Sequence, residues 1–197
     1  MPSLSRKLSP TVTDMIRFDH SHVLITFHQF AADRSPRVRK ALADTICNAL
    51  EIHAMLEEEI FYPAMTGLEA DEVVLEKSEP EHDEMRRIIG LLRQTDPVLP
   101  RHAELVTELM RDVMHHVADE ETVLLPRAER CLSAQQLREL GAAMTRRRMQ
   151  LLSPQAGKIA VDTVVGFSGS ALARVAGAIG AVCALGYVFS KSSRRST

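Results

Sequence analysis

The chain has 197 residues, enough for one domain of about 150 residues plus an appendage. Its 24 Lys and Arg residues nearly balance 26 Asp and Glu residues, giving a formal net charge of -2, so no global basic field exists to hold a nucleic-acid backbone. Cys47, Cys131 and Cys183 form no CxxC pair, and the N-terminal MPSLSRKLSP lacks the apolar core of a secretory signal. We therefore expect no nucleic-acid partner, disulfide scaffold, thiolate zinc site or signal-peptide secretion.

Apolar residues recur at three- and four-residue spacing through four segments, the pattern of amphipathic helices, and convincing strand alternation is absent. The first helix is expected over about residues 11–31, and the second opens at Ser35-Pro36 and continues to about Pro63. The third lies between the Thr66-Gly67 break and Asp96-Pro97, and the fourth runs from Pro100 to about Leu125. Because Pro80 falls inside the third segment, a kink or a fresh helix start is predicted there.

Four helices joined by short turns predict an all-α, up-down-up-down four-helix bundle. A further helix is indicated by Ser133 with Gln136 three residues later, a capping box, and it runs through three arginines at 146–148 to Ser153-Pro154. A solvated helix end is the simplest interpretation of these arginines, and contact with acidic lipid or a partner is the alternative. We expect one domain over 10–152, a linker or short helix over 153–170, and an apolar tail helix with a basic end over 171–197.

The tail is uncharged from residue 175 to 190, about 24 Å of helix against a hydrocarbon core of roughly 30 Å. Ala173, Gly177 and Ala181 form a small-x-x-x-small ridge, which fits a membrane anchor or a self-association helix of a homo-oligomer. A helix folded onto the bundle is the plain alternative. The basic end opposes a simple span from the cytoplasm, so we expect a cytoplasmic protein whose tail contacts the inner face of the membrane.

All eight histidines lie between His20 and His116, and four of them fall on the apolar stripes, one on each helix. His20, for example, lies four residues after Ile16 and three before Val23. Two glutamates also lie on these apolar stripes, at positions that face the interior of the bundle. The six inward polar residues are His20, His53, Glu57, His82, His116 and Glu120.

Buried carboxylates and imidazoles need partners, because burying them alone costs several kcal/mol, and a cation could partner all six groups. Two His-x-x-x-Glu pairs stack their side chains one turn apart on one helix face. The segment from His53 to Pro63 aligns with that from His116 to Pro126. This repeat suits two metals bridged by Glu57 and Glu120. Imidazole and carboxylate ligands in a helix bundle favour iron, with manganese next and zinc third.

Other polar residues near the seam have ordinary interpretations. Glu58 and Glu121 could be alternative ligands or could orient imidazoles, although exposed helix charges are slightly favoured. Tyr62 could approach the site from the end of the second helix, but packing is the simpler role. Four histidines are expected to be ordinary surface or packing residues, with a register slip from His116 to His115 as the alternative: His22, His28, His102 and His115.

These motifs resemble the hemerythrin-like proteins with an HHE cation-binding domain, over about residues 10–150. The matching pattern is His20, His53-x-x-x-Glu57 with Pro63, Glu81-His82, and His116-x-x-x-Glu120 with Pro126. The resemblance implies a bundle that binds two non-haem irons, with Glu57 and Glu120 as bridges and the histidines as terminal ligands.

The chain also departs from the oxygen-carrying hemerythrins in two places. Those proteins have a His-x-x-x-His pair on the third helix, where this chain has Arg86 four residues after His82. They also have an aspartate five residues after the last histidine, where this chain has Glu120 at four. These departures argue against oxygen carriage and favour the intracellular HHE branch, which is associated with iron, oxygen, peroxide or nitric-oxide responses.

Three functions from different classes stay open at this point. The first, which we favour, is a di-iron module that senses or handles iron, O2, NO or peroxide. The second is a catalase-like di-iron enzyme that consumes peroxide. The third is a membrane-linked structural adaptor in which the metal only ties the hairpins together. Because the sequence offers no separate acid–base dyad, nucleophile or phosphate loop, it does not decide whether the protein is an enzyme.

Overall fold

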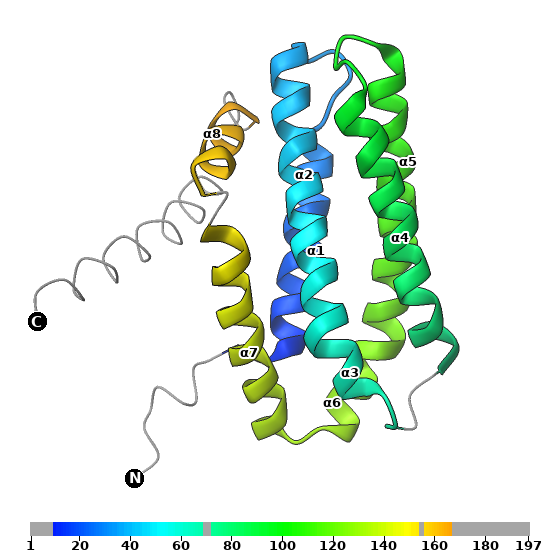
Figure 1. The fold of residues 1–197 in the computed structure, drawn as a ribbon. Helices are drawn as coiled ribbons and strands as arrows, with labels where there is room; N and C mark the ends of the chain where they lie inside the picture. Colours follow the sequence, from blue (N-terminus) through cyan, green and yellow to red (C-terminus); the bar gives the residue numbers. More distant parts are fainter. Residues whose placement is uncertain (1–9, 69–71, 154–155, 167–197) are drawn as a thin grey trace, which may run out of the picture.

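The computed structural model describes residues 10–68, 72–153 and 156–166, and these residues form helices and turns with no strand (Figure 1). Four long helices make the bundle: α1 (Val12–Gln29), α2 (Pro36–Leu56), α4 (Glu72–Gln94) and α5 (Pro100–Asp119). Within it α1 packs on α2 and α4 packs on α5. The predicted all-α four-helix bundle with an extra C-terminal helix is confirmed.

Cap residues set the helix starts where the sequence indicated them. Ser35 caps α2 ahead of Pro36 at the first helical position, and Ser133 caps α7 (Ala134–Leu152) through a capping box with Gln136. Gly67, with a φ of 80°, turns the chain after the second helical segment, a conformation that glycine adopts without steric cost. The predicted break at Thr66-Gly67 therefore has a local physical cause.

Pro80 does not begin a new helix, so that alternative is wrong: α4 continues through it from Glu72 to Gln94. A proline inside a helix removes one backbone hydrogen bond, the one to the carbonyl four residues earlier, here Glu76. Both Glu76 and Pro80 are exposed. Water can therefore hydrate the carbonyl that loses its partner, which lowers the cost of keeping the helix continuous.

Two π-helical turns interrupt the bundle, and the sequence did not predict them. The turn η2 (Glu57–Phe61) joins α2 to the short helix α3 (Tyr62–Met65), and η3 (Glu120–Leu124) joins α5 to α6 (Leu125–Cys131). In each turn a backbone N–H bonds to the carbonyl five residues earlier, that of Glu57 or Glu120. A proline follows each turn and has no N–H to continue the ordinary helical ladder.

The apolar core is divided into two clusters. One lies between the four long helices and includes the expected Val23, Ile46 and Leu109, all buried. The other was largely missed, because it forms only where α7 closes over the ends of the bundle. It joins Leu137 and Met144 of α7 to residues such as Phe61 and Leu125 at the π-turns.

The chain after α7 begins a further short helix, α8 (Ala156–Gly166), which packs on α2. Lys158 of α8 makes an ion pair with Asp44 of α2 at 2.9 Å. The expected apolar tail helix at 171–197 lies outside the described residues. Within the described ranges, no helix combines the length and apolarity needed to cross a membrane.

The docking of α7 on the start of α1 generates a stability prediction. A Cβ added at Gly141 would lie 2.4 Å from the carbonyl oxygen of Pro10 and 2.9 Å from the carbonyl carbon of Thr11, so backbone must move. We expect Gly141→Ala to lower the free energy of unfolding by about 1–3 kcal/mol, measured by urea denaturation of the metal-free chain. Gly90→Ala is the control, because a Cβ there meets nothing within 4 Å. It should be neutral or stabilising by up to about 1 kcal/mol, and equal effects of the two substitutions would refute the prediction.

Candidate metal centre

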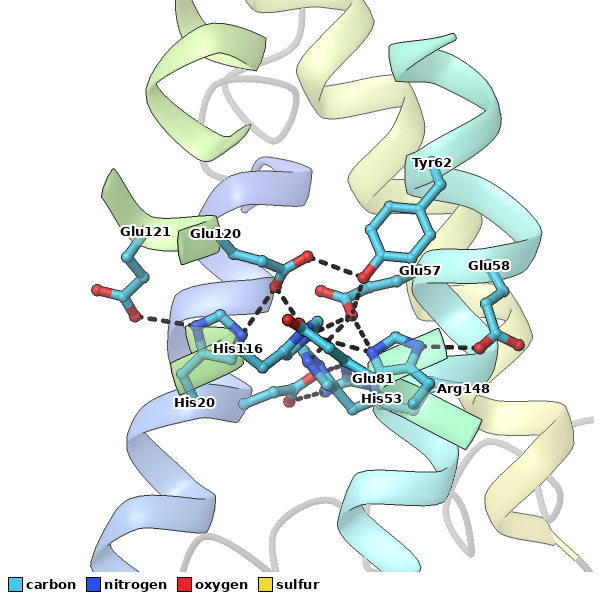
Figure 2. Close-up of polar contacts among 12 residues, drawn as sticks. His20, His53, Glu57, Glu58, Tyr62, Glu81, His116, Glu120, Glu121 and Arg148 are labelled. Carbon is cyan, nitrogen blue, oxygen red and sulfur yellow. Dashed lines mark hydrogen bonds and ion pairs between the residues drawn. The ribbon is translucent and has the colours of Figure 1, made fainter. Parts of the chain in front are cut away.

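The four long helices each bring one buried histidine to the middle of the bundle, between the two apolar clusters, and Figure 2 shows three of them, His20, His53 and His116, beside Glu57 and Glu120. Two glutamates join them at the first residues of the π-turns. None of the six residues is more than 5% exposed, and both glutamates are 0% exposed. The structure thus brings together all six residues singled out by sequence: His20, His53, Glu57, His82, His116 and Glu120.

The Nε2 atoms of the histidines face the glutamate carboxylates. Glu57 Oε2 lies 3.2 Å from His53 Nε2, 3.4 Å from His82 Nε2 and 3.9 Å from His116 Nε2. Glu120 Oε2 lies 3.3 Å from His20 Nε2 and 3.5 Å from His116 Nε2. Each carboxylate therefore approaches histidines from both halves of the internal repeat.

The potential ligand atoms fall into two groups, with atoms less than 4.8 Å apart inside each group. One group contains His20, His53, Glu57 and Glu120, and the other contains Glu57, His82 and His116. Glu57 belongs to both groups, and Glu120 contacts both His20 and His116. This arrangement suits two adjacent cations. The described residues can accommodate such a pair without a thiolate ligand.

The Nδ1 atoms of the four histidines point outward to a second set of carboxylates. His20 Nδ1 lies 2.9 Å from Glu121 Oε1, and His82 Nδ1 lies 2.8 Å from Glu58 Oε1. Glu58 and Glu121 are therefore not simply exposed helix charges, the interpretation that the sequence slightly favoured. Their oxygens accept the Nδ1–H and orient each ring so that Nε2 faces inward, where His82 Nε2 lies 3.1 Å from His116 Nε2.

The Nδ1 atoms of the other two histidines face acidic residues that directly precede a ligand candidate, through a hydrogen bond at His116 and through a longer ion-pair contact at His53, whose Nδ1 has no hydrogen-bond partner. His116 Nδ1 lies 2.9 Å from Glu81 Oε2, and His53 Nδ1 lies 3.5 Å from Asp19 Oδ2. The two-fold repeat thus extends to the outer carboxylates, with Asp19 matching Glu81. Sequence reasoning gave neither of these two residues a role.

Tyr62 contributes to the centre, which corrects the expected packing role. Its hydroxyl lies 2.9 Å from Glu120 Oε1 and 3.2 Å from Glu57 Oε2. The ring is only 4% exposed, because the π-turn η2 directs it back over the two carboxylates (Figure 2). Burial and the two nearby carboxylates raise the pKa of Tyr62, so the phenol stays protonated and can donate a hydrogen bond.

Arg86 stands where oxygen-carrying hemerythrins have a fifth histidine, and it contacts an outer carboxylate. Its guanidinium lies 2.6 and 2.7 Å from the two carboxylate oxygens of Glu58, which in turn accepts from His82. The arginine therefore acts on the orientation of His82 through Glu58.

The remaining histidines were expected to be ordinary, and none of them joins the centre. His28 and His115 are exposed, which argues against the slipped register with His115 as ligand. His102 is buried, 2% exposed, far along α5 from His116, and it stacks on Phe30 with ring centroids 6.2 Å apart. Its role is in packing.

Buried nitrogen and oxygen atoms that lack a hydrogen-bond partner test whether the site fits a cation. Among the described residues, four inward-facing atoms have no hydrogen-bond partner although all are buried: His20 Nε2, His53 Nε2, Glu57 Oε1 and Glu120 Oε2. Such orphaned groups are rare in folded proteins because desolvation is not compensated. Nitrogen and oxygen donors of this kind suit iron, manganese or zinc, so the residues fit the cation.

A small cavity of about 10 Å³ adjoins the histidines on the side of the first apolar cluster. Its walls include Val23, Leu50, Met85 and Val113 as well as the four histidines. A space of this size holds about one water-sized molecule.

The electrostatics of the metal-free site favour the protonated forms of His116 and His20. Burial lowers the pKa of His116, but the charges and hydrogen bonds of Glu120, Glu57 and Glu81 outweigh it and raise the pKa to about 10. The pKa of His20 is also raised, because Glu120 outweighs its burial. Burial raises the pKa of Glu57, yet His53, His116 and His82 hold it well below its usual range. In the metal-free site, protons on His116 and His20 therefore compensate the negative charge of the carboxylates, as a bound cation would.

Comparison with known proteins agrees with this geometry. The model of the family described as Hemerythrin HHE cation binding domain matches residues 11–128. A relative from Nostoc sp. (strain PCC 7120 / SAG 25.82 / UTEX 2576), named DNA nickase, is 30% identical over 132 residues. That match covers 67% of this chain but only 37% of the relative.

A similar fold occurs in the crystal structure of a hemerythrin HHE cation binding domain-containing protein, described as an Rv2633c homolog, from Mycobacterium kansasii. The TM-score is 0.62 at 21% identity, and the match covers 83% of this chain and 98% of the other.

The raised pKa of His116 predicts a definite pH dependence for the metal-free chain. The folded-state pKa of about 10 exceeds the unfolded value of about 6.5, so this stabilisation is fully present below pH 6.5. It should be lost as pH rises from about 6.5 to 10. Urea denaturation across this range should show falling stability. His116→Gln should flatten the curve, and an unchanged slope in that variant would contradict the assignment.

Proposed function

Because the chain belongs to the hemerythrin HHE cation-binding family, we propose that its buried site holds a non-haem di-iron centre. The ligands are His20, His53, Glu57, His82, His116 and Glu120, with Glu57 and Glu120 as bridges. The centre serves to sense or handle iron, O2, NO or peroxide. The observation that carries this proposal is the convergence of four histidines and two glutamates on one buried site, where His20 Nε2, His53 Nε2 and one oxygen of each glutamate have no hydrogen-bond partner.

The combination of nitrogen and oxygen ligand atoms favours iron. Four imidazoles and two carboxylates provide no thiolate, and mixed His and Glu ligation in a helix bundle is typical of di-iron carboxylate proteins. Manganese follows iron, and zinc is third. Two bound irons would supply redox chemistry and a coordination position open to a small ligand.

The chain's own residues give the proposed centre its surroundings. Outer carboxylates hold His20, His82 and His116 by Nδ1, and Asp19 faces Nδ1 of His53, so that each Nε2 is directed inward. Val23, Met85 and Val113 exclude water from all but a cavity of about 10 Å³, which favours a diatomic ligand over a larger polar substrate. Tyr62 donates a hydrogen bond toward Glu120 and Glu57, and so fixes the orientation of both bridges.

A peroxide-consuming enzyme is the second candidate, and Tyr62 is the observation that favours it. A phenol that keeps its O–H beside two buried carboxylates is a hydrogen-bond donor at a site where bulk water is scarce, and a positioned donor of this kind can stabilise charge that develops during a reaction. The structural adaptor is the third candidate, and it depends on residues 171–197, which lie outside the described residues. The activity named for the Nostoc relative is not carried over, because the chain spans only 37% of that protein.

The ligand assignment predicts the metal content of purified protein. We expect about two irons per chain from iron-replete cells, and a loss of at least one in His53→Ala and in His116→Ala, measured by elemental analysis. His28→Ala is the matched control, because His28 lies on α1 with His20 but is exposed. Two irons in all three variants, or no stoichiometric metal in the parent chain, would contradict the assignment.

The sensing role predicts how the loaded protein responds to small molecules. We expect the optical spectrum of the iron-loaded chain to change on addition of NO or O2 and to recover when the gas is removed. Sustained peroxide turnover that His116→Ala abolishes would instead identify the enzyme. Tyr62→Phe separates the two roles, because loss of the phenol O–H donor should slow turnover about 10²-fold or more while gas binding persists.

A further inference from the structure

Three of the four outer carboxylates of the site lie near a lysine or arginine, and one of these cations comes from outside the bundle. Glu58 is held by Arg86 and Glu81 lies near Lys77, both of α4. Asp19 of α1 is held by Arg148 of α7 instead. Arg148 Nη1 lies 2.8 Å from Asp19 Oδ1, and Nη2 contacts Oδ2.

This contact links α7 to a metal ligand through one intermediate. Asp19 Oδ2, which Arg148 contacts, lies 3.5 Å from His53 Nδ1, and His53 Nε2 lies 3.2 Å from Glu57. The side chain of Asp19 is 15% exposed and that of Arg148 is 21% exposed, so the pair is largely shielded from solvent. A two-pronged arginine–carboxylate contact of this kind fixes orientation as well as charge.

The two-fold repeat makes this link asymmetric. His116, the repeat partner of His53, is held by Glu81, and the cation near Glu81 belongs to α4 inside the bundle. Arg148 lies beyond residues 11–128, the part of the chain that matches the family. The appended helix therefore completes the surroundings of one half of the centre and not of the other.

We propose that Arg148 is a positioning residue for His53, so that the metal position formed with His20 and His53 is held tightly only when α7 is docked. This inference rests on the proposed metal centre. Arg148 fixes the carboxylate of Asp19, and Asp19 in turn fixes the ring of His53 and the direction of its Nε2. Loss of an outer partner of a metal-binding histidine typically costs 10- to 100-fold in metal affinity.

Neighbouring arginines on α7 provide a matched comparison. Arg147 is also in a two-pronged contact, with Glu59 at 2.6 and 2.8 Å, but the side chain of Glu59 is 41% exposed and touches no ligand candidate. Both arginines tie α7 to the bundle. Only Arg148 leads on to a histidine of the centre, so the two can separate positioning from simple docking of the helix.

The test uses the full chain loaded anaerobically with ferrous iron and challenged with a chelator. We expect Arg148→Gln to release one of the two irons about 10- to 100-fold faster than the parent, while the second iron leaves at the parent rate. Arg147→Gln should behave like the parent. Arg148→Lys should recover part of the effect, because lysine restores the charge but not the planar fork.

The route through Asp19 is tested by a double-mutant cycle. In an Asp19→Asn background, Arg148→Gln should change iron release by less than twofold, since the intermediate is already lost. Equal release rates in Arg148→Gln and the parent would overturn the proposal. So would equal acceleration in Arg147→Gln and Arg148→Gln, or additive effects in the cycle.

A second readout needs no substitution and stays informative if Arg148→Gln fails to fold. Because linkage is reciprocal, iron binding to the parent chain should slow hydrogen exchange of α7 around residues 144–150. Unchanged exchange there would overturn the inference. A parent chain that binds no iron would instead refute the proposed function, whereas a parent with two irons and unchanged α7 exchange would refute only the role of Arg148.

Discussion

Two fully buried glutamates at the middle of an apolar bundle are the constraint on which the rest of the structure depends. Glu57 and Glu120 are both 0% exposed, and an uncompensated carboxylate in such surroundings costs several kcal/mol. Four imidazoles surround them, so the polar groups form one cluster and the hydrophobic core is divided on either side of it. A cation with nitrogen and oxygen ligands is the compensation that this donor set suits best.

The π-turns make this cluster geometrically attainable. Each begins at a buried glutamate and ends shortly before a proline, which cannot donate to the ordinary helical ladder. The wider turn shifts the register of the residues that follow it. In the first turn this shift directs Tyr62 back over the carboxylates, so that a phenol rather than water contacts them. π-turns inside helices often occur at functional sites, and here the reason is visible.

Charges alternate outward from the centre in a regular order. Inner carboxylates face Nε2, outer carboxylates accept from Nδ1, and arginines or a lysine contact the outer carboxylates. Such an arrangement fixes the imidazoles before any cation binds and limits the reorganisation that binding requires. It also explains why Arg147 and Arg148, expected to form a solvated helix end, instead lie against Glu59 and Asp19.

The sequence by itself determined the bundle, its helix starts and the six residues of the inner cluster. Helical periodicity shows which residues share a helix face, so six polar groups at inward-facing positions can be recognised from the sequence alone. Tertiary structure alone decided the roles of Tyr62, Glu58, Glu121, Asp19 and Arg148. Their contacts join different helices or depend on a π-turn, and helical periodicity carries no information about which distant faces meet. The residues proposed to bind metal could therefore be predicted from sequence, whereas the residues that orient them depend on how the helices pack.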